Sequence, residues 1–359
     1  MATTTQYSPD LDLNRMLLEA GASKTVYALV APWTEHAKAR VLGNQGGDAR
    51  LAYLQQFREA WTGKQDAYHR EFFETWIEWS GRVVDLDPHI WTFRYPTAGA
   101  SEPIRHLVYD LASRTHGKGR VHVFAGEYEG YRAMAEAAGL DLLEHDRDMD
   151  GIPENIADLA VQVREGDLFF LSQPSAIDGN VWQHFNDFVD AMPDGSIIAD
   201  VTYVGSVPRS AVTERFDLDA PSIRNIVFSL SKPFGCYYDR IGGMFSRDED
   251  PGMFGNRWFK NLTSIALGLD LMRNHHVFDI PERMQDLQKQ ASREISGRLG
   301  MTLTPSHVTL LATSEERKRG ALADYLERAG RSRVCLTPRL NELVTASNRR
   351  SRWNAEERG

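Results

Sequence analysis

The chain has 359 residues, 42% of them hydrophobic and 25% charged, which is the balance of a globular protein with room for two domains. Its formal net charge of −9 argues against a nucleic-acid-binding surface, which is usually basic. Two cysteines cannot build a disulfide framework, no apolar run could span a membrane, and the N-terminus has no signal-peptide pattern, so we expect a cytoplasmic enzyme.

The N-terminal region has helical periodicity over residues 10–75. It ends in an aromatic stripe of Phe57, Trp61, Tyr68, Phe72, Phe73, Trp76 and Trp79. Such a stripe is typical of a hydrophobic core or of a subunit interface, and an interface here would support a homodimer.

Between about 90 and 245, short apolar runs alternate with helical stretches. The expected strands are 120–125, 167–172, 196–200, 225–230 and 243–246, and the expected helices between them include 129–138 and 182–191. Several of the runs are apolar throughout, as in parallel strands covered on both faces. We therefore predict an α/β domain with a mostly parallel sheet and with functional residues at the carboxyl ends of its strands.

The C-terminal region predicts a smaller α+β domain. Helices are expected around 258–272 and 281–299, strands near 307–311 and 334–336, and a frayed polar tail over 348–359. The predicted division is an N-terminal helical segment (1–50), a large domain (51–250) and a small C-terminal domain (251–359).

One lysine stands out for its setting. Lys232 follows the apolar run 225–230 within Ser229-Leu-Ser231-Lys232. Burial lowers the pKa of a lysine and makes it an amine nucleophile for an aldehyde. The hydroxyls of Ser229 and Ser231, with Arg240 eight residues after the lysine, can bind a phosphate. An aldehyde and a phosphate on one ligand indicate pyridoxal 5′-phosphate (PLP); the alternative is an exposed lysine beside a structural arginine.

The order of motifs resembles that of fold-type I PLP-dependent enzymes of the class I/II aminotransferase-like family. That family carries S-x-S-K, an arginine eight residues later and then a glycine, as do Lys232, Arg240 and Gly242. The resemblance covers residues 95–245, and it implies a large domain with a mostly parallel sheet, a small α+β domain and a homodimer with its sites at the subunit boundary. Residues 1–90 match no motif of the family.

The resemblance extends to the cofactor's phosphate and ring. Gly99-Ala100-Ser101 precedes a helical stretch, where open N–H groups favour an anion, so Ala100 and Ser101 are expected to contact the phosphate. Tyr128 follows the strand 120–125, where the family stacks an aromatic ring on the pyridine. The alternatives are an ordinary helix cap and a surface tyrosine.

Asp200 closes the run 196–200, and a buried carboxylate there needs a partner. The resemblance implies that this partner is the pyridine nitrogen of PLP, whose positive charge Asp200 would maintain. Tyr203 would then donate its hydroxyl to the phenolate oxygen of the cofactor. The alternative for Asp200 is a structural salt bridge.

The sequence departs from the family at Ala176. The family has an asparagine at this place, and its amide bonds the phenolate oxygen. The nearby substitutes are Gln173, Ser175 and Asn180, and the residues do not distinguish among them.

Late in the chain, Arg333 resembles the arginine that holds the substrate's α-carboxylate in a bidentate fork. Arg331 and Arg339 are the competing neighbours. The adjacent His275 and His276 point apart on a helix and have no zinc-like ligand spacing, so no metal is predicted.

Together these residues predict a PLP-dependent enzyme that acts at the α-carbon of an amino acid through a Schiff base on Lys232. Lys232, Asp200 and Tyr203 are the expected catalytic residues, and Lys232 is also the expected general base. An aminotransferase is favoured. The alternatives are a β- or γ-elimination lyase, another non-transaminating PLP enzyme and, from a different class, a regulatory module, for which no DNA-binding segment is seen.

Overall fold

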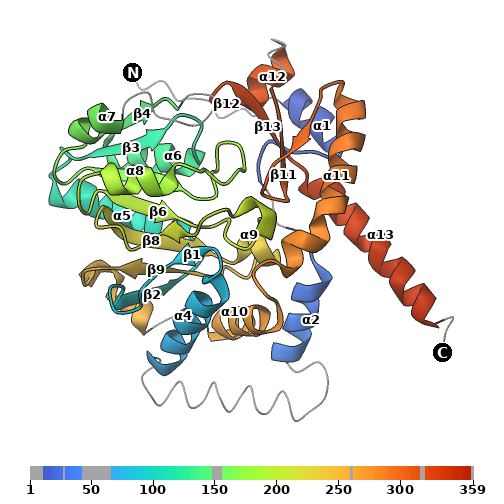
Figure 1. The fold of residues 1–359 in the computed structure, drawn as a ribbon, viewed down its shortest axis with the longest axis horizontal. Helices are drawn as coiled ribbons and strands as arrows, with labels where there is room; N and C mark the ends of the chain where they lie inside the picture. Colours follow the sequence, from blue (N-terminus) through green and yellow to red (C-terminus); the bar gives the residue numbers. More distant parts are fainter. Residues whose placement is uncertain are drawn as a thin grey trace.

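The apolar runs in the middle of the chain form one seven-stranded sheet, in the order β2-β9-β8-β6-β5-β3-β4 (Figure 1). The computed structural model describes residues 11–26, 29–42, 66–147, 156–258, 262–315 and 320–356. The strands are β2 (Phe93–Thr97), β3 (Arg120–Phe124), β4 (Asp141–His145), β5 (Leu168–Ser172), β6 (Ile197–Asp200), β8 (Ile223–Ser229) and β9 (Gly242–Ser246). Only β9 runs antiparallel to its neighbours among these strands, so the predicted mostly parallel sheet is confirmed.

Helices cover both faces of this sheet. One face packs against α5 (Ser101–Arg114) and α6 (Glu129–Ala138), and the other packs against α4 (Asp66–Ser80), α7 (Ile156–Gln162), α8 (Phe185–Ala191) and α10 (Leu262–Asn274). Strand β5 is buried at every position, and its successive side chains enter the two cores alternately. This two-sided burial explains why its sequence is apolar throughout.

The aromatic stripe belongs to the core. Phe72, Phe73 and Trp76 of α4 are at most 1% exposed, and the Trp76 ring stacks on Phe228 of β8 with ring centroids 4.5 Å apart. The interface interpretation is therefore wrong for these three residues, because their apolar surface is already buried within the chain. Phe57 and Trp61 lie outside the described residues.

A second, four-stranded antiparallel sheet has the order β10-β11-β13-β12. Its strands are β10 (Thr304–Pro305), β11 (Leu311–Ser314), β12 (Glu327–Arg328) and β13 (Arg331–Cys335). The helices of this region are α11 (Asp279–Leu299), α12 (Ala321–Leu326) and α13 (Thr337–Glu356). The N-terminal segment joins this part of the molecule, since α1 (Leu11–Glu19) lies beside it and Ser23 pairs with Cys335 (Figure 1).

The remaining elements are short or peripheral. They are α2 (Pro32–Val41), β1 (Val84–Asp85), β7 (Phe216–Asp217), α9 (Ser231–Phe234) and the 3-10 helices η1 (Arg209–Ala211) and η2 (Pro251–Arg257). Strands β1 and β7 pair with each other in parallel. None of the described helices has the length and hydrophobicity needed to cross a membrane.

Three local predictions need correction. The strand expected at 307–311 is displaced to β11, because the backbone N–H groups of Val308 and Thr309 donate to the carbonyls of Gly179 and Ser206, not to a neighbouring strand. The expected frayed tail is helical to the end of α13, which has no glycine or proline after Pro338 to stop it. Strands β2 and β4, the two edges of the large sheet, are missing from the predicted set: β2 contains Pro96, which only an edge strand tolerates, and β4 is only partly buried and mixes charged with apolar residues.

Candidate functional site

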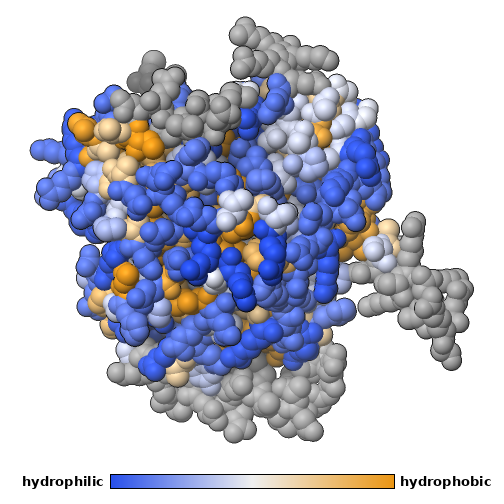
Figure 2. Space-filling model, in the orientation of Figure 1, coloured by the Kyte–Doolittle hydropathy of each residue, from blue (hydrophilic) through white to orange (hydrophobic). Residues whose placement is uncertain are grey.

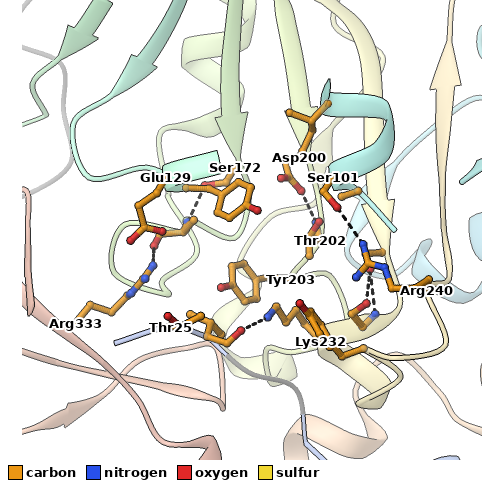
Figure 3. A pocket seen from close by; sticks show the side chains of 18 residues that line it. Thr25, Ser101, Glu129, Ser172, Asp200, Thr202, Tyr203, Lys232, Arg240 and Arg333 are labelled. Atoms are coloured by element: carbon orange, nitrogen blue, oxygen red, sulfur yellow. Dashed lines mark hydrogen bonds between the residues drawn. The ribbon is translucent and has the colours of Figure 1, made fainter. Parts of the chain in front are cut away.

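The carboxyl ends of β5, β6 and β8 meet at one edge of the large sheet, since these strands are parallel. A cavity of about 310 Å³ opens there, between this edge and the small sheet (Figure 3). Its lining includes each residue that the sequence predicted: Ala100, Ser101, Tyr128, Asp200, Tyr203, Ser229, Ser231, Lys232, Arg240 and Arg333. The cavity is also lined by Thr25, Val26, Ser172, Thr202 and Tyr237, which the sequence did not predict.

Lys232 lies in α9, the single turn of helix that follows β8. Its ammonium donates a hydrogen bond of 2.5 Å to the backbone carbonyl of Val26, from the N-terminal segment (Figure 3). Burial lowers the pKa of Lys232 from 10.5 to about 8. About a tenth of this lysine is therefore a neutral amine at about pH 7, far more than for a lysine with an ordinary pKa, and the neutral amine is the form that a nucleophile requires.

A cradle for an anion lies on one side of Lys232. The Arg240 guanidinium donates to the Ala98 carbonyl at 2.7 Å and to the Ser101 hydroxyl at 3.0 Å, at the start of α5. Gly99 has a φ of +78°, which favours glycine, and a Cβ there would lie 2.8 Å from Arg240 Nη2 and displace the guanidinium from this turn. Arg240 itself has a φ of 52°, an uncommon backbone conformation that aims its side chain at the turn.

Asp200 ends β6 and is 7% exposed. Its carboxylate accepts a hydrogen bond of 2.8 Å from the Tyr131 hydroxyl and one of 3.0 Å from the Thr202 backbone N–H. Burial nevertheless raises the pKa of Asp200, because these hydrogen bonds do not fully offset its desolvation. A cation placed beside Asp200 in the cavity would stabilise its charge.

Two tyrosines face the cavity. Tyr203 is 7% exposed, and burial raises its pKa to about 12, so its hydroxyl stays protonated and can donate. Tyr128 is 40% exposed and packs edge-to-face on Tyr131, with ring centroids 5.4 Å apart. Both tyrosines line the same cavity as Lys232, and Figure 3 shows Tyr203 facing it.

The residues expected to replace the missing amide at Ala176 are all engaged elsewhere. Gln173 exchanges hydrogen bonds with the backbone of Trp182. Ser175 accepts from Arg147, and Asn180 bonds Asp178 and the backbone of His307. None of the three lines the cavity that contains Ala176.

The polar group beside Ala176 is Ser172, at the end of β5. Its hydroxyl accepts a hydrogen bond of 2.7 Å from the Ala176 N–H and lies 2.7 and 2.8 Å from the two carboxyl oxygens of Glu127. Glu127 is 6% exposed, and burial raises its pKa to about 7. Glu127 precedes Tyr128 and Tyr131 follows it by three residues, so acidic or phenolic groups within a few residues of a buried strand were the available signal for them.

Arg333 comes from β13 of the small sheet and is 5% exposed. One guanidinium nitrogen donates to the Ala176 carbonyl, whereas the buried Nε has no hydrogen-bond partner among the described residues. A buried guanidinium donor without an acceptor is costly, and a carboxylate in the cavity would satisfy it. The competitors are paired elsewhere: Arg331 with Asp178 at 3.4 Å, and Arg339 with Glu294 at 2.6 Å.

The two adjacent histidines lie apart from this cavity. The His275 carbonyl accepts from the Trp79 indole, and His276 Nδ1 accepts from the Phe278 N–H. Within the described part of the chain, no group of three or more His, Cys, Asp or Glu residues is arranged to hold a metal ion.

No protein-family model matches this chain, and no curated protein sequence matches it. Solved structures do. The histidinol-phosphate aminotransferase of Sinorhizobium meliloti in complex with pyridoxal-5′-phosphate is 16% identical with a TM-score of 0.61, and the match covers 96% of this chain and 99% of that one. The PLP-bound C-S lyase of Staphylococcus hominis is 12% identical with a TM-score of 0.64, covering 97% and 95%. A mutant aspartate aminotransferase of Thermus thermophilus is 14% identical with a TM-score of 0.63, covering 96% and 97%.

These similarities extend over nearly the whole chain. The predicted fold, that of the fold-type I PLP-dependent transferases, is therefore confirmed.

Proposed function

We propose that this protein is a PLP-dependent enzyme that acts at the α-carbon of an amino acid, and that it is an aminotransferase. The observation that carries the proposal is the position of Lys232, a buried amine with a pKa lowered to about 8, in one cavity with the anion cradle of Arg240 and Ser101. An amine and an anion site so arranged suit a ligand with an aldehyde and a phosphate.

The residues of the cavity fit PLP group by group. Arg240 and Ser101, with Ala100, Ser229 and Ser231 beside them, would hold the phosphate. Asp200 would pair with the pyridine nitrogen, and Tyr128 would stack on the ring. Tyr203 would donate to the phenolate oxygen. When bound, PLP supplies the electron sink that makes the α-proton of an amino acid acidic.

The remaining chemistry belongs to the chain's own side chains. Lys232 would hold the cofactor covalently and then, as a free amine, remove and return the α-proton. Because its pKa is about 8, both the neutral and the protonated forms are accessible near neutral pH. Arg333 would bind the α-carboxylate through the Nε that has no other acceptor among the described residues.

A β- or γ-elimination lyase is the second candidate. The observation that favours it is Ala176, since a changed hydrogen bond at the phenolate oxygen alters the electronics of the cofactor. A lyase also stands among the solved structures with this fold. The amine, acid and carboxylate-binding groups of the cavity serve both reactions. Transamination remains the favoured reaction because the motifs of this chain resemble those of the aminotransferase-like family, and aminotransferases stand among the solved structures with this fold.

One experiment separates the two reactions. The purified protein, loaded with PLP, is mixed with a panel of amino acids while its visible absorbance is followed and the products are identified. Formation of pyridoxamine phosphate and an oxo acid supports the aminotransferase. Release of ammonia with PLP retained supports the lyase, and failure to bind PLP contradicts both.

We also propose a cytoplasmic homodimer. The buried aromatic stripe gives this proposal no support. Exposed aromatic rings near the cavity support a dimer contact there. Tyr237 lines the cavity and is 41% exposed, and the adjacent Tyr238 is 86% exposed. On the face shown in Figure 2, hydrophilic side chains predominate and hydrophobic ones are scattered. A subunit contact on that face would therefore bury only a small apolar area. Sedimentation of a fully active monomer would contradict the proposal.

We further propose that the large domain spans residues 51–250 and the small domain 251–359, after an N-terminal segment of 1–50. The two sheets support this division, because they fall within 93–246 and 304–335, whereas α10 (Leu262–Asn274) of the C-terminal part packs on the large sheet. Limited proteolysis near residue 250 that releases two folded fragments would test the boundary.

A further inference from the structure

A carboxyl group is buried directly behind the cavity wall. Glu127 follows β3 and is 6% exposed, and its two oxygens lie 2.8 and 2.7 Å from the hydroxyl of Ser172. Ser172 ends β5, lines the cavity and also accepts a hydrogen bond of 2.7 Å from the Ala176 N–H. Glu127 itself does not line the cavity, so it can reach a bound ligand only through Ser172.

The number of hydrogen bonds available to Ser172 depends on the proton of Glu127. A serine hydroxyl has one proton to donate and two lone pairs that accept. When Glu127 is ionised, the Ser172 proton is committed to the carboxylate and none faces the cavity. When Glu127 is protonated, its O–H and the Ala176 N–H fill the two lone pairs, and the Ser172 proton is released toward the cavity.

We propose that Glu127 and Ser172 are a proton-holding pair, in which protonated Glu127 makes the Ser172 hydroxyl donate a hydrogen bond to the phenolate oxygen of PLP. The pair would take the place of the amide that is missing at Ala176. This inference rests on the proposed function. Ser172 would contact the cofactor, and Glu127 is a positioning residue that acts through it.

The surroundings of Glu127 are compatible with a protonated carboxyl group at working pH. Desolvation raises the pKa of Glu127 to about 7, and Asp200 contributes in the same direction, while Ser172 and Arg147 oppose it. A phenolate bound beside Ser172 would add negative charge and so favour the protonated form further. Other titratable or charged groups near Glu127 include Tyr128, Glu129 and Tyr131 of the following segment and Arg328 of β12. The hollow that Glu127 lines on its other side is also bordered by Lys24, Arg132, Glu144, Asp146 and Glu327.

The first test uses the protein without cofactor. Infrared difference spectra recorded across about pH 5 to 9 report the C=O stretch of a protonated carboxyl group. We expect a band in the wild type that titrates with a midpoint near 7 and that is absent in Glu127→Gln. In Ser172→Ala the midpoint should rise, because the carboxylate loses the hydroxyl donor and keeps only the backbone N–H groups of residue 172 and Tyr128. Absence of a Glu127 band in the wild type would overturn the proposal.

The second test uses the PLP-loaded protein and its visible absorbance. The side-chain amide introduced by Glu127→Gln donates to Ser172 at every pH, so this variant should keep the low-pH spectrum and lose the transition near pH 7. Ser172→Ala should have the high-pH spectrum throughout. Ser80→Ala is the matched control, because Ser80 is also buried but donates to the Trp76 carbonyl, away from the cavity.

The outcomes separate the two claims. If both variants titrate as the wild type does, the pair does not act on the cofactor and the inference is wrong. If neither the wild type nor the variants bind PLP, the proposed function fails, and the assignment of Ser172 to the cofactor fails with it. In that case the infrared titration still decides whether the Glu127 carboxyl group is protonated beside Ser172.

Discussion

The Lys232 ammonium donates its hydrogen bond to the backbone carbonyl of Val26, a residue 206 positions earlier in the chain. The N-terminal segment thus closes the cavity from the side of the small sheet and holds the amine in place. Lys232 is buried, and this burial lowers its pKa. The reactivity of the lysine is therefore tied to the docking of a segment that carries no family motif.

Replacement of Lys232 by alanine is expected to remove covalent PLP and nearly all turnover. Borohydride reduction of the loaded protein, followed by peptide mapping, should place the pyridoxyl group on Lys232. Lys24→Ala is the matched control, because Lys24 is also partly buried near the site, where its ammonium lies over the Tyr325 ring. A label on Lys24 or any other lysine would contradict the assignment.

The stability of the cofactor-free protein should depend on the titration of Lys232. Its pKa is about 8 in the folded chain and 10.5 as a free side chain, so between these values only the unfolded chain holds the proton and the free energy of unfolding rises with pH. Lys232→Met removes the burial penalty and should be more stable at about pH 7, by on the order of 3 kcal/mol at most. Denaturant unfolding at about pH 7 and pH 10 measures this difference, which should shrink at the higher pH; a constant difference would mean that Lys232 has an ordinary pKa.

Asp200→Ala should leave some PLP bound but lower the rate by about a hundredfold or more, because the ring nitrogen loses its counter-charge. Tyr131→Phe is a graded companion, since it removes one hydrogen bond and leaves the Thr202 N–H on Asp200. We expect it to cost about tenfold in kcat. Steady-state kinetics with PLP in excess measures both. Normal turnover in Asp200→Ala would mean that Asp200 is structural.

Gly99→Ala should weaken PLP binding by about tenfold or more, because the new Cβ would lie 2.8 Å from Arg240 Nη2. Gly117→Ala is matched in backbone conformation, with φ +75° against +78°, and its Cβ would meet nothing within 4 Å. Both variants share the strain of an alanine at positive φ, about 1 kcal/mol. Titration of the cofactor-free proteins with PLP gives the difference, and equal affinities would place the phosphate elsewhere.

Arg333→Ala is expected to raise KM strongly for carboxylate substrates while PLP stays bound, since a bidentate contact at a desolvated site is worth about 2–5 kcal/mol. Arg331→Ala and Arg339→Ala should change KM little, because their partners are Asp178 and Glu294, outside the cavity. Kinetics of the three variants with one amino acid tests this. A large effect at Arg339 with none at Arg333 would require another carboxylate site.

The sequence by itself determined the fold class and the residues of the cavity that carry reactive or charged groups. Asp200 and Lys232 each follow an apolar run, and parallel strands bring their carboxyl ends to one edge, so order along the chain predicts proximity in space. The spacing of Lys232 and Arg240 carries the same kind of local information.

Only the tertiary structure decided which partners these groups have. Val26 contacts Lys232 across 206 residues of the chain. Tyr131 contacts Asp200 across 69 residues, and Glu127 contacts Ser172 across 45. A backbone carbonyl leaves no mark in the sequence, and a buried acid has the same letter as an exposed one. Arg333 resembles a family arginine in the sequence, but its burial and the missing acceptor at its Nε are properties of packing, not of residue type.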